Sequence, residues 1–126
     1  MTPQSNKELI KQYLEALRKD KSPATLDKYI VEEDLKHHIA AFEVSFPGYW
    51  LEVEDMIAEG DQVFARTVFH GVHKGELNGI RPTGKTVSAP LYIAYKIAHN
   101  KIVAHWMLPD NLSIMQQIGA FPATTR

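Results

Sequence analysis

One short stretch near the C-terminus brings together side chains that could move protons. His105 and Trp106 belong to an alternating apolar run, residues 101–109, and Asp110 follows it directly. Such alternation indicates a β-strand that is at least half buried. An imidazole can act as a base and a carboxyl group as an acid or a base in a suitable environment. The chemistry that these residue types predict is therefore general acid–base catalysis.

Asp110 has two interpretations that can both hold. Aspartate is a favoured N-cap residue, and apolar residues at helical spacing follow it until Gly119. Alternatively, Asp110 is a general acid or base, which requires shielding from water because dehydration disfavours the charged carboxylate. Residues 106 and 110 have the same parity, so we expect the Trp106 indole to exclude water from the Asp110 carboxyl group. We expect this pocket to include at least one of the aromatic residues Tyr13, Trp50, Tyr92 and Tyr95.

The histidines supply further candidates for the site. His105 is either a second catalytic residue in the pocket or a histidine of the core or of a dimer face. His73, at the end of a predicted strand, is either a polar strand-end residue or a hydrogen-bond donor on the pocket rim. His37 is a candidate ligand contact, and the roles of His37 and His38 depend on the fold of the ambiguous segment that contains them. No HxH or HExxH spacing occurs, so we predict no metal site.

The composition excludes several classes of function. The chain has 126 residues, 44% of them apolar, which predicts one globular domain spanning residues 1–126. Its 14 basic and 15 acidic residues give a net charge of -1, which argues against nucleic acid or an anionic membrane as partner. The absence of cysteine fits the cytoplasm and excludes a thiol nucleophile. The polar N-terminus and the lack of a long apolar run predict neither a signal peptide nor a membrane span.

The periodicity changes once along the chain. Ser5 and Glu8 form a capping-box pattern for a helix that runs to about residue 19, and Pro23 suits the first turn of a second helix. Residues 32–34 are predicted to be a solvated acidic cluster. Residues 39–44 are predicted to be helical or irregular and to lie outside the sheet. Strands are predicted at 50–58, 62–73, 86–97 and from 101 onward, which indicates an α+β fold with helices on one face of an antiparallel sheet.

The predicted strand 62–73 is apolar on both faces. Val63 and Phe69 lie on one face, and Phe64 and Val68 lie on the other. A strand of this kind is normally covered on both sides. We expect the helices to cover the first pair and a second subunit to cover the other pair, so the sequence predicts a homodimer.

Three segments carry a resemblance to a known family. They are FPGYWLEVEDMIAEGD at 46–61, HGVHKGE with GIRPTGK at 70–85, and KIVAHW through Asp110 to MQQIG at 101–119. In this order the segments resemble the SnoaL-like polyketide cyclases of the nuclear transport factor 2-like superfamily. The family usually has a carboxylate where this chain has Ala104, and Pro109 is unusual before the acid.

The resemblance implies a cone-shaped fold, in which a curved sheet wraps over N-terminal helices around an internal pocket. It also implies an enzyme that acts on a small apolar carbonyl compound without a cofactor, by aldol-type ring closure or isomerisation, with Asp110 as acid and base. Hydrolysis and dehydration occur on the same fold. A protein that only binds a small apolar or aromatic molecule is the alternative.

Overall fold

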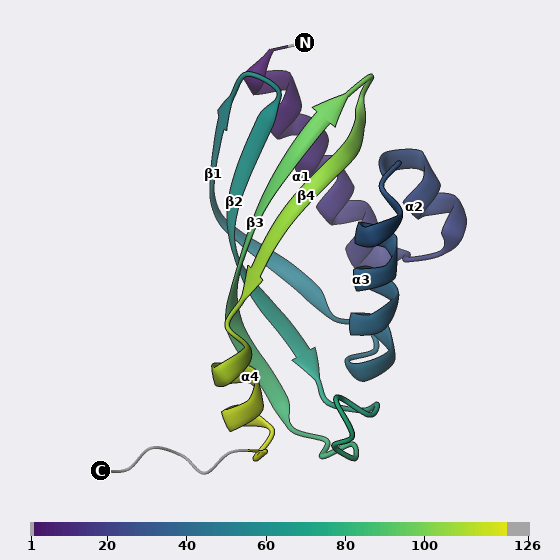
Figure 1. Ribbon diagram of the computed structural model, residues 1–126, viewed down its shortest axis with the longest axis vertical. Coiled ribbons are helices and arrows are strands. Elements are labelled where there is room, and N and C mark those ends of the chain that lie inside the picture. Colours follow the sequence, from purple (N-terminus) through teal and green to yellow (C-terminus); the bar gives the residue numbers. More distant parts are fainter. Residues whose placement is uncertain (1, 121–126) are drawn as a thin grey trace.

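The computed structural model describes residues 2–120, in which three helices precede a sheet and one short helix follows it (Figure 1). The four strands form one antiparallel sheet in the order β1-β2-β3-β4. The predicted α+β class is therefore confirmed. The elements are α1 (Pro3–Lys19), α2 (Pro23–Tyr29), α3 (Glu33–Ser45), β1 (Trp50–Glu59), β2 (Gln62–Val72), β3 (Thr86–Ala98), β4 (Lys101–Pro109) and α4 (Asn111–Gln117).

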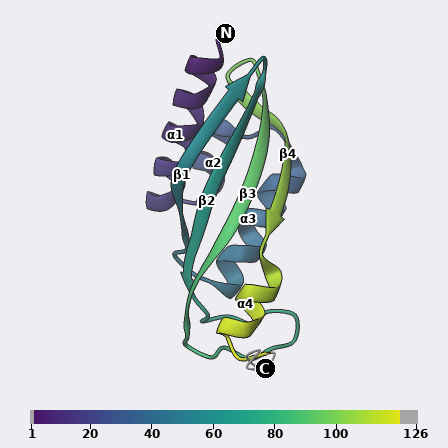
Figure 2. The ribbon, with the colours of Figure 1, turned by 90° about the vertical axis from the view of Figure 1, so that its left-hand side faces the viewer.

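The sheet is long, twisted and curved, and the first three helices lie on one side of it. In Figure 2 the strands lie in front of α2 and α3, and no helix crosses the strands on the viewer's side. Helix α4 lies at the far end of the sheet, near the C-terminus of the described chain (Figures 1 and 2). None of the helices between residues 2 and 120 is long and apolar enough to cross a membrane.

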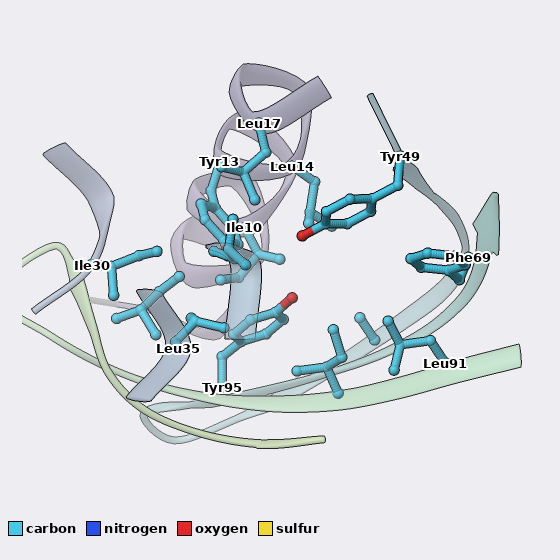
Figure 3. Close-up of a cluster of buried hydrophobic side chains, with 14 of the residues drawn as sticks. Ile10, Tyr13, Leu14, Leu17, Ile30, Leu35, Tyr49, Phe69, Leu91 and Tyr95 are labelled. Carbon is cyan, nitrogen blue, oxygen red and sulfur yellow. The ribbon is translucent and has the colours of Figure 1, made fainter. Parts of the chain in front are cut away.

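The core fills the space between α1 and the concave face of the sheet (Figure 3). Ile10 and Tyr13 of α1 are almost completely buried, and they meet Tyr95 of β3 across the core. The Tyr13 and Tyr95 rings pack edge to face, with centroids 5.9 Å apart. Aromatic pairs of this geometry add stabilisation beyond the area that they bury. Phe69 of β2 closes the same core.

The first helix begins earlier than predicted. Thr2 is the N-cap, and its Oγ1 accepts a hydrogen bond from the Ser5 backbone N–H at 3.0 Å. The Ser5 hydroxyl oxygen accepts one from the Thr2 backbone N–H at 3.0 Å, which completes a capping box. The predicted box of Ser5 and Glu8 is therefore wrong. Pro3 explains the earlier start, because proline is favoured in the first turn of a helix.

The ambiguous segment is helical. Residues 39–44 lie inside α3, so the prediction that they are outside the sheet is confirmed. Leu35 and Ile39, one turn apart, are both buried against the rest of the protein. The predicted solvated cluster at 32–34 is only partly correct, because Glu32 is half buried.

The two faces of β2 differ in burial within one chain. Val63 and Phe69 on the concave face are 0% and 1% exposed, as predicted. Phe64 on the outer face is 41% exposed and Val68 is half buried. The outer face therefore remains partly uncovered in the single chain, and its predicted cover by a second subunit remains a prediction.

Candidate functional site

A cleft opens between α3, the turn at residues 76–78 and the end of β4. We call it the α3 cleft, and its volume is about 570 Å³. An adjoining hollow of about 390 Å³ shares four lining residues with it and extends toward α4. The volume of the α3 cleft suits a small organic ligand. The α3 cleft is lined by His38, Ala41, Phe42, Val44, Ser45, Glu76, Leu77, Asn78, Met107, Pro109 and Asn111.

Gly75 holds the 76–78 turn against the C-terminal end of α3. Its backbone N–H donates to the Ser45 carbonyl oxygen at 3.1 Å, and the Ser45 hydroxyl donates to the Glu76 carbonyl oxygen at 2.7 Å. A Cβ atom at position 75 would lie 1.7 Å from the carbonyl oxygen of Val44. Only glycine permits this close approach, so the position of this cleft wall depends on Gly75.

A chain of three side chains ends at the rim of the α3 cleft. Nδ1 of His105 lies 2.6 Å from Oε1 of Glu32, and Nε2 of His105 lies 2.9 Å from Nδ1 of His38. The His105 side chain is only 4% exposed and that of Glu32 is 22% exposed. His38 is exposed and lines the cleft. The chain therefore runs from a shielded carboxylate, through a buried imidazole, to an imidazole in contact with the cleft.

The backbone between α2 and α3 places Glu32 beside β4. Ile30 forms a parallel bridge with Ile102, and the Val31 N–H donates to the Ile102 carbonyl oxygen at 2.9 Å. Glu32 follows Ile30 by two residues and His105 follows Ile102 by three, so the Glu32 carboxylate reaches His105. On β4, His105 lies directly opposite the buried Tyr95, so it faces the concave side. The predicted position of His105 on an outer dimer face is therefore excluded.

Asp110 is exposed rather than enclosed by aromatic side chains. Its Oδ1 accepts a hydrogen bond from the Ser113 N–H at 3.0 Å, so the predicted capping role is confirmed. The predicted burial beside Trp106 is wrong, because the carboxylate turns toward the first turn of α4. Its two neighbours, Pro109 and Asn111, both line the α3 cleft. Asp110 therefore lies at the cleft mouth without being part of its wall.

Three predicted ligand contacts belong to the outer face of the sheet. Trp106 is 55% exposed and lies opposite Ala94, because alternation along β4 turns it away from His105. Tyr92 packs edge to face against Phe64. Trp50 stacks on His70 on the same outer face, with centroids 4.6 Å apart. None of the three predicted aromatic contacts lines the α3 cleft.

Tyr13 and Tyr95 belong to the core instead of the cleft wall. Each is 1% exposed. Burial raises the pKa of both phenols well above the ordinary value of 10.0, and the nearby phenols of Tyr95 and Tyr49 raise the pKa of Tyr13 further. Both side chains are therefore neutral at physiological pH. Neither side chain lines the α3 cleft, in contrast to the predicted ligand contact.

The two remaining predicted residues also lie away from the cleft wall. His73 is completely buried, so the predicted rim position is wrong. Its Nδ1 accepts the Thr83 N–H at 3.2 Å and lies 3.0 Å from the Thr83 hydroxyl, which ties down the loop before β3. His37 is exposed, and it is not among the residues that line the cleft. Residues 2–120 contain no group of three or more histidine, cysteine, aspartate or glutamate side chains placed to bind a metal ion.

Sequence reasoning did not identify Glu32 and His38 as members of the site. One local signal was available. Glutamate is not among the favoured N-cap residues, yet Glu32 occupies this position of α3 and makes no capping hydrogen bond. A residue that breaks a local rule often serves another purpose, and here its carboxylate binds His105.

A comparison with profiles of protein families identifies the family of this chain. The profile of the SnoaL-like polyketide cyclases matches residues 5–118. The chain belongs to this family. The match spans α1 through α4 and includes both the α3 cleft and the Glu32, His105 and His38 chain. The resemblance predicted from the three sequence segments is thus confirmed.

Solved structures of related folds support the assignment of this SnoaL-like protein to the nuclear transport factor 2-like fold. AclR from Streptomyces galilaeus, a candidate hydroxylase, is 22% identical with a TM-score of 0.86, over 99% of this chain and 87% of AclR. IdmH from Streptomyces antibioticus, a candidate polyketide cyclase, is 23% identical with a TM-score of 0.78, over 90% of this chain and 98% of IdmH. At these identities the likeness establishes the fold alone. None of the curated proteins matches the sequence.

Proposed function

We propose that this SnoaL-like protein catalyses ring closure or isomerisation of a small, largely apolar carbonyl compound by general acid–base chemistry, without a cofactor. The substrate would bind in the α3 cleft. The observation that carries the proposal is the presence of proton-carrying side chains at the edge of this mainly apolar cleft. An apolar cleft favours an apolar ligand, and a few polar groups at its edge can orient that ligand.

The reaction needs only proton transfers. A base removes a proton from a carbon that is flanked by carbonyl groups, which stabilise the resulting enolate. The enolate carbon then forms a bond to a second carbonyl carbon of the same molecule, and the alkoxide that results takes up a proton. An aldol-type closure of this kind conserves all atoms and requires no oxidant or metal. His105 and Asp110, as predicted from the sequence, are the residues that we propose to take part.

The Asp110 carboxyl group would transfer protons at the mouth of the α3 cleft. Its carboxylate caps α4, and the residues on either side of it line the cleft wall. A ligand that fills the cleft would shield this carboxylate from water, which favours its protonated form. The capping bond does not prevent proton transfer, because a carboxylate has a second oxygen.

The alternative is a protein of this fold that only binds its ligand. The exposure of Asp110 and its capping bond favour this alternative, since a carboxylate with a structural role alone would look the same. The short bond between Glu32 and His105 favours the enzyme. Core packing does not require a shielded imidazole between a carboxylate and a second imidazole.

We also propose that the protein is a homodimer through the outer face of its sheet. Ile57, Phe64, Ala94 and Trp106 form one row across all four strands, and Leu108 lies next to this row. Trp106 and Leu108 are 55% and 74% exposed in the single chain. Large exposed apolar side chains in one patch are typical of an interaction surface.

The experiment that tests the proposed function is a matched pair of cleft variants. Ala41 and Ala24 are both exposed on helices, but only Ala41 lines the α3 cleft. Ala41→Trp should abolish the conversion of an active compound from a panel of polyketides and lactones, whereas Ala24→Trp should not. Equal activity of both variants would show that catalysis does not use this cleft.

A further inference from the structure

We propose that Glu32, His105 and His38 form a proton relay, and that Nε2 of His38 is the base that takes the proton from the substrate. The inference deepens the proposed function, on which it rests for the nature of the substrate. It adds one catalytic residue, His38, and one positioning residue, Glu32, and it makes His105 the link between them. The hydrogen-bond order within the relay can be tested without any substrate.

The donor and acceptor roles follow from the chemistry of the groups. An ionised carboxylate can only accept hydrogen bonds, so Nδ1 of His105 must carry the hydrogen that is shared with Glu32 at 2.6 Å. In the neutral ring, Nε2 of His105 is then an acceptor. The contact of 2.9 Å with His38 therefore requires that Nδ1 of His38 carries a hydrogen. Nε2 of a neutral His38 is left with a free lone pair.

The location of the relay suits a base that acts on a ligand. His38 is exposed and lines the α3 cleft, whereas the His105 side chain is 4% exposed and is closed off from water. A proton that arrives at Nε2 of His38 allows the Nδ1 proton to shift toward His105. The positive charge then lies next to the Glu32 carboxylate, which stabilises it. The alkoxide that forms on ring closure takes up a proton from this imidazolium or from a protonated Asp110 at the cleft mouth.

Other ionisable groups near the relay do not change this assignment. Tyr95 lies directly opposite His105 on β3, and its buried phenol stays neutral. Glu76 lies on the other wall of the cleft from His38 and is exposed. Lys36, two residues before His38 on α3, binds Asp27 at 2.6 Å instead of the histidines. Glu32 is therefore the charged group in direct contact with the relay among the described residues.

Nitrogen NMR of the histidine rings tests the relay directly, in the presence of a chelator that removes stray metal ions. Neutral His105 and His38 should both carry their hydrogen on Nδ1. In Glu32→Gln the preference of His105 for hydrogen on Nδ1 should weaken, because an amide can donate as well as accept, while the tautomer of exposed His99 should not change. Hydrogen on Nε2 of neutral His105 would overturn the proposal.

Kinetics tests the role of His38 with a variant that keeps the relay contact. In His38→Asn the side-chain amide can still donate to His105, but the basic Nε2 is gone. The value of kcat/KM should fall by about 10²-fold or more, the usual contribution of a general base. The matched control His99→Asn removes an exposed imidazole from the turn between β3 and β4 and should change nothing. Full activity of His38→Asn would refute its catalytic role.

Failure of the relay and failure of the proposed function give different results. Hydrogen on Nδ1 of both neutral rings, together with no conversion of any compound by the parent protein, would leave the relay in place and reject catalysis. Conversion by the parent protein with a fully active His38→Asn variant would keep the enzyme and reject the relay.

Discussion

The Glu32 carboxylate lies 2.6 Å from Nδ1 of His105, although Glu32 occupies the N-cap position of α3. A side chain in this position would normally accept a hydrogen bond from the first turn of the helix. Here it accepts one from a strand that follows 73 residues later. The start of α3 is thus linked to the concave face of β4, and this link places His38 at the rim of the cleft.

The capping and proposed catalytic roles of Asp110 can be separated by two substitutions. Asp110→Asn keeps an oxygen that can accept from the Ser113 N–H, so the free energy of unfolding should change little. Asp110→Ala should lower it by about 1 kcal/mol, as loss of an N-cap usually does. If Asp110 transfers protons, turnover should fall by about 10²-fold or more in both variants. An Asn variant as active as the parent would reduce Asp110 to a cap, and chemical denaturation with steady-state kinetics measures both effects.

The outer face of the sheet should hold two subunits together. Sedimentation at micromolar concentration should show a dimer for the parent protein and a monomer for Trp106→Glu, because a carboxylate in an apolar interface is costly. Val31→Glu changes an apolar residue that is 55% exposed but does not belong to the outer-face row, so this control should remain dimeric. A monomeric parent protein would contradict the prediction.

The buried tyrosines should make the protein sensitive to alkali. Burial raises the pKa of Tyr13, Tyr49 and Tyr95, so the folded protein keeps these phenols protonated above pH 10, where the unfolded chain loses the protons. The unfolded state then binds fewer protons, and the free energy of unfolding must fall as the pH rises above about 10. Urea denaturation between about pH 9 and pH 11 should show a shallower fall for Tyr95→Phe than for the parent. Equal slopes would refute this explanation.

Gly75 should be essential for the cleft wall. In Gly75→Ala the new Cβ would meet the Val44 carbonyl oxygen, and the resulting shift should cost about 1–3 kcal/mol of stability and weaken ligand binding in the cleft. Gly60→Ala is the control, because Gly60 has φ +58° in the turn between β1 and β2 but no neighbour within 4 Å of its Cβ position. It should lose about 1–2 kcal/mol through backbone strain alone and bind ligand normally. Unchanged ligand binding by Gly75→Ala would contradict this account of the wall.

The fold was more predictable than the site, because periodicity reports local structure. The two-residue alternation located all four strands, and the helical spacing after Asp110 located α4. The same alternation could have placed Trp106 on the outer face, but the sequence offered no fixed reference for which face was concave. Tyr95, directly opposite His105, provides that reference only once the strands are paired.

The Glu32, His105 and His38 chain could not be predicted from local patterns. Its contacts join residues that are 73 and 67 positions apart, on three different segments. The acidic residues next to Glu32 predict a solvated run, and His38 is one of two adjacent histidines in a segment without a clear period. The parallel bridge between Ile30 and Ile102 brings the Glu32 segment to β4, and a two-residue contact leaves no repeating signal in the sequence.

The most direct test of the central claim is a crystal structure of the protein with a compound that it converts, captured in an inactive His38→Asn variant. The claim predicts that this compound occupies the α3 cleft, with its activated carbon next to the side chain at position 38. The distance should be about 3–3.5 Å, the range from which a bound substrate reacts. A compound bound elsewhere, or bound in the cleft with that carbon remote from position 38, would contradict the claim.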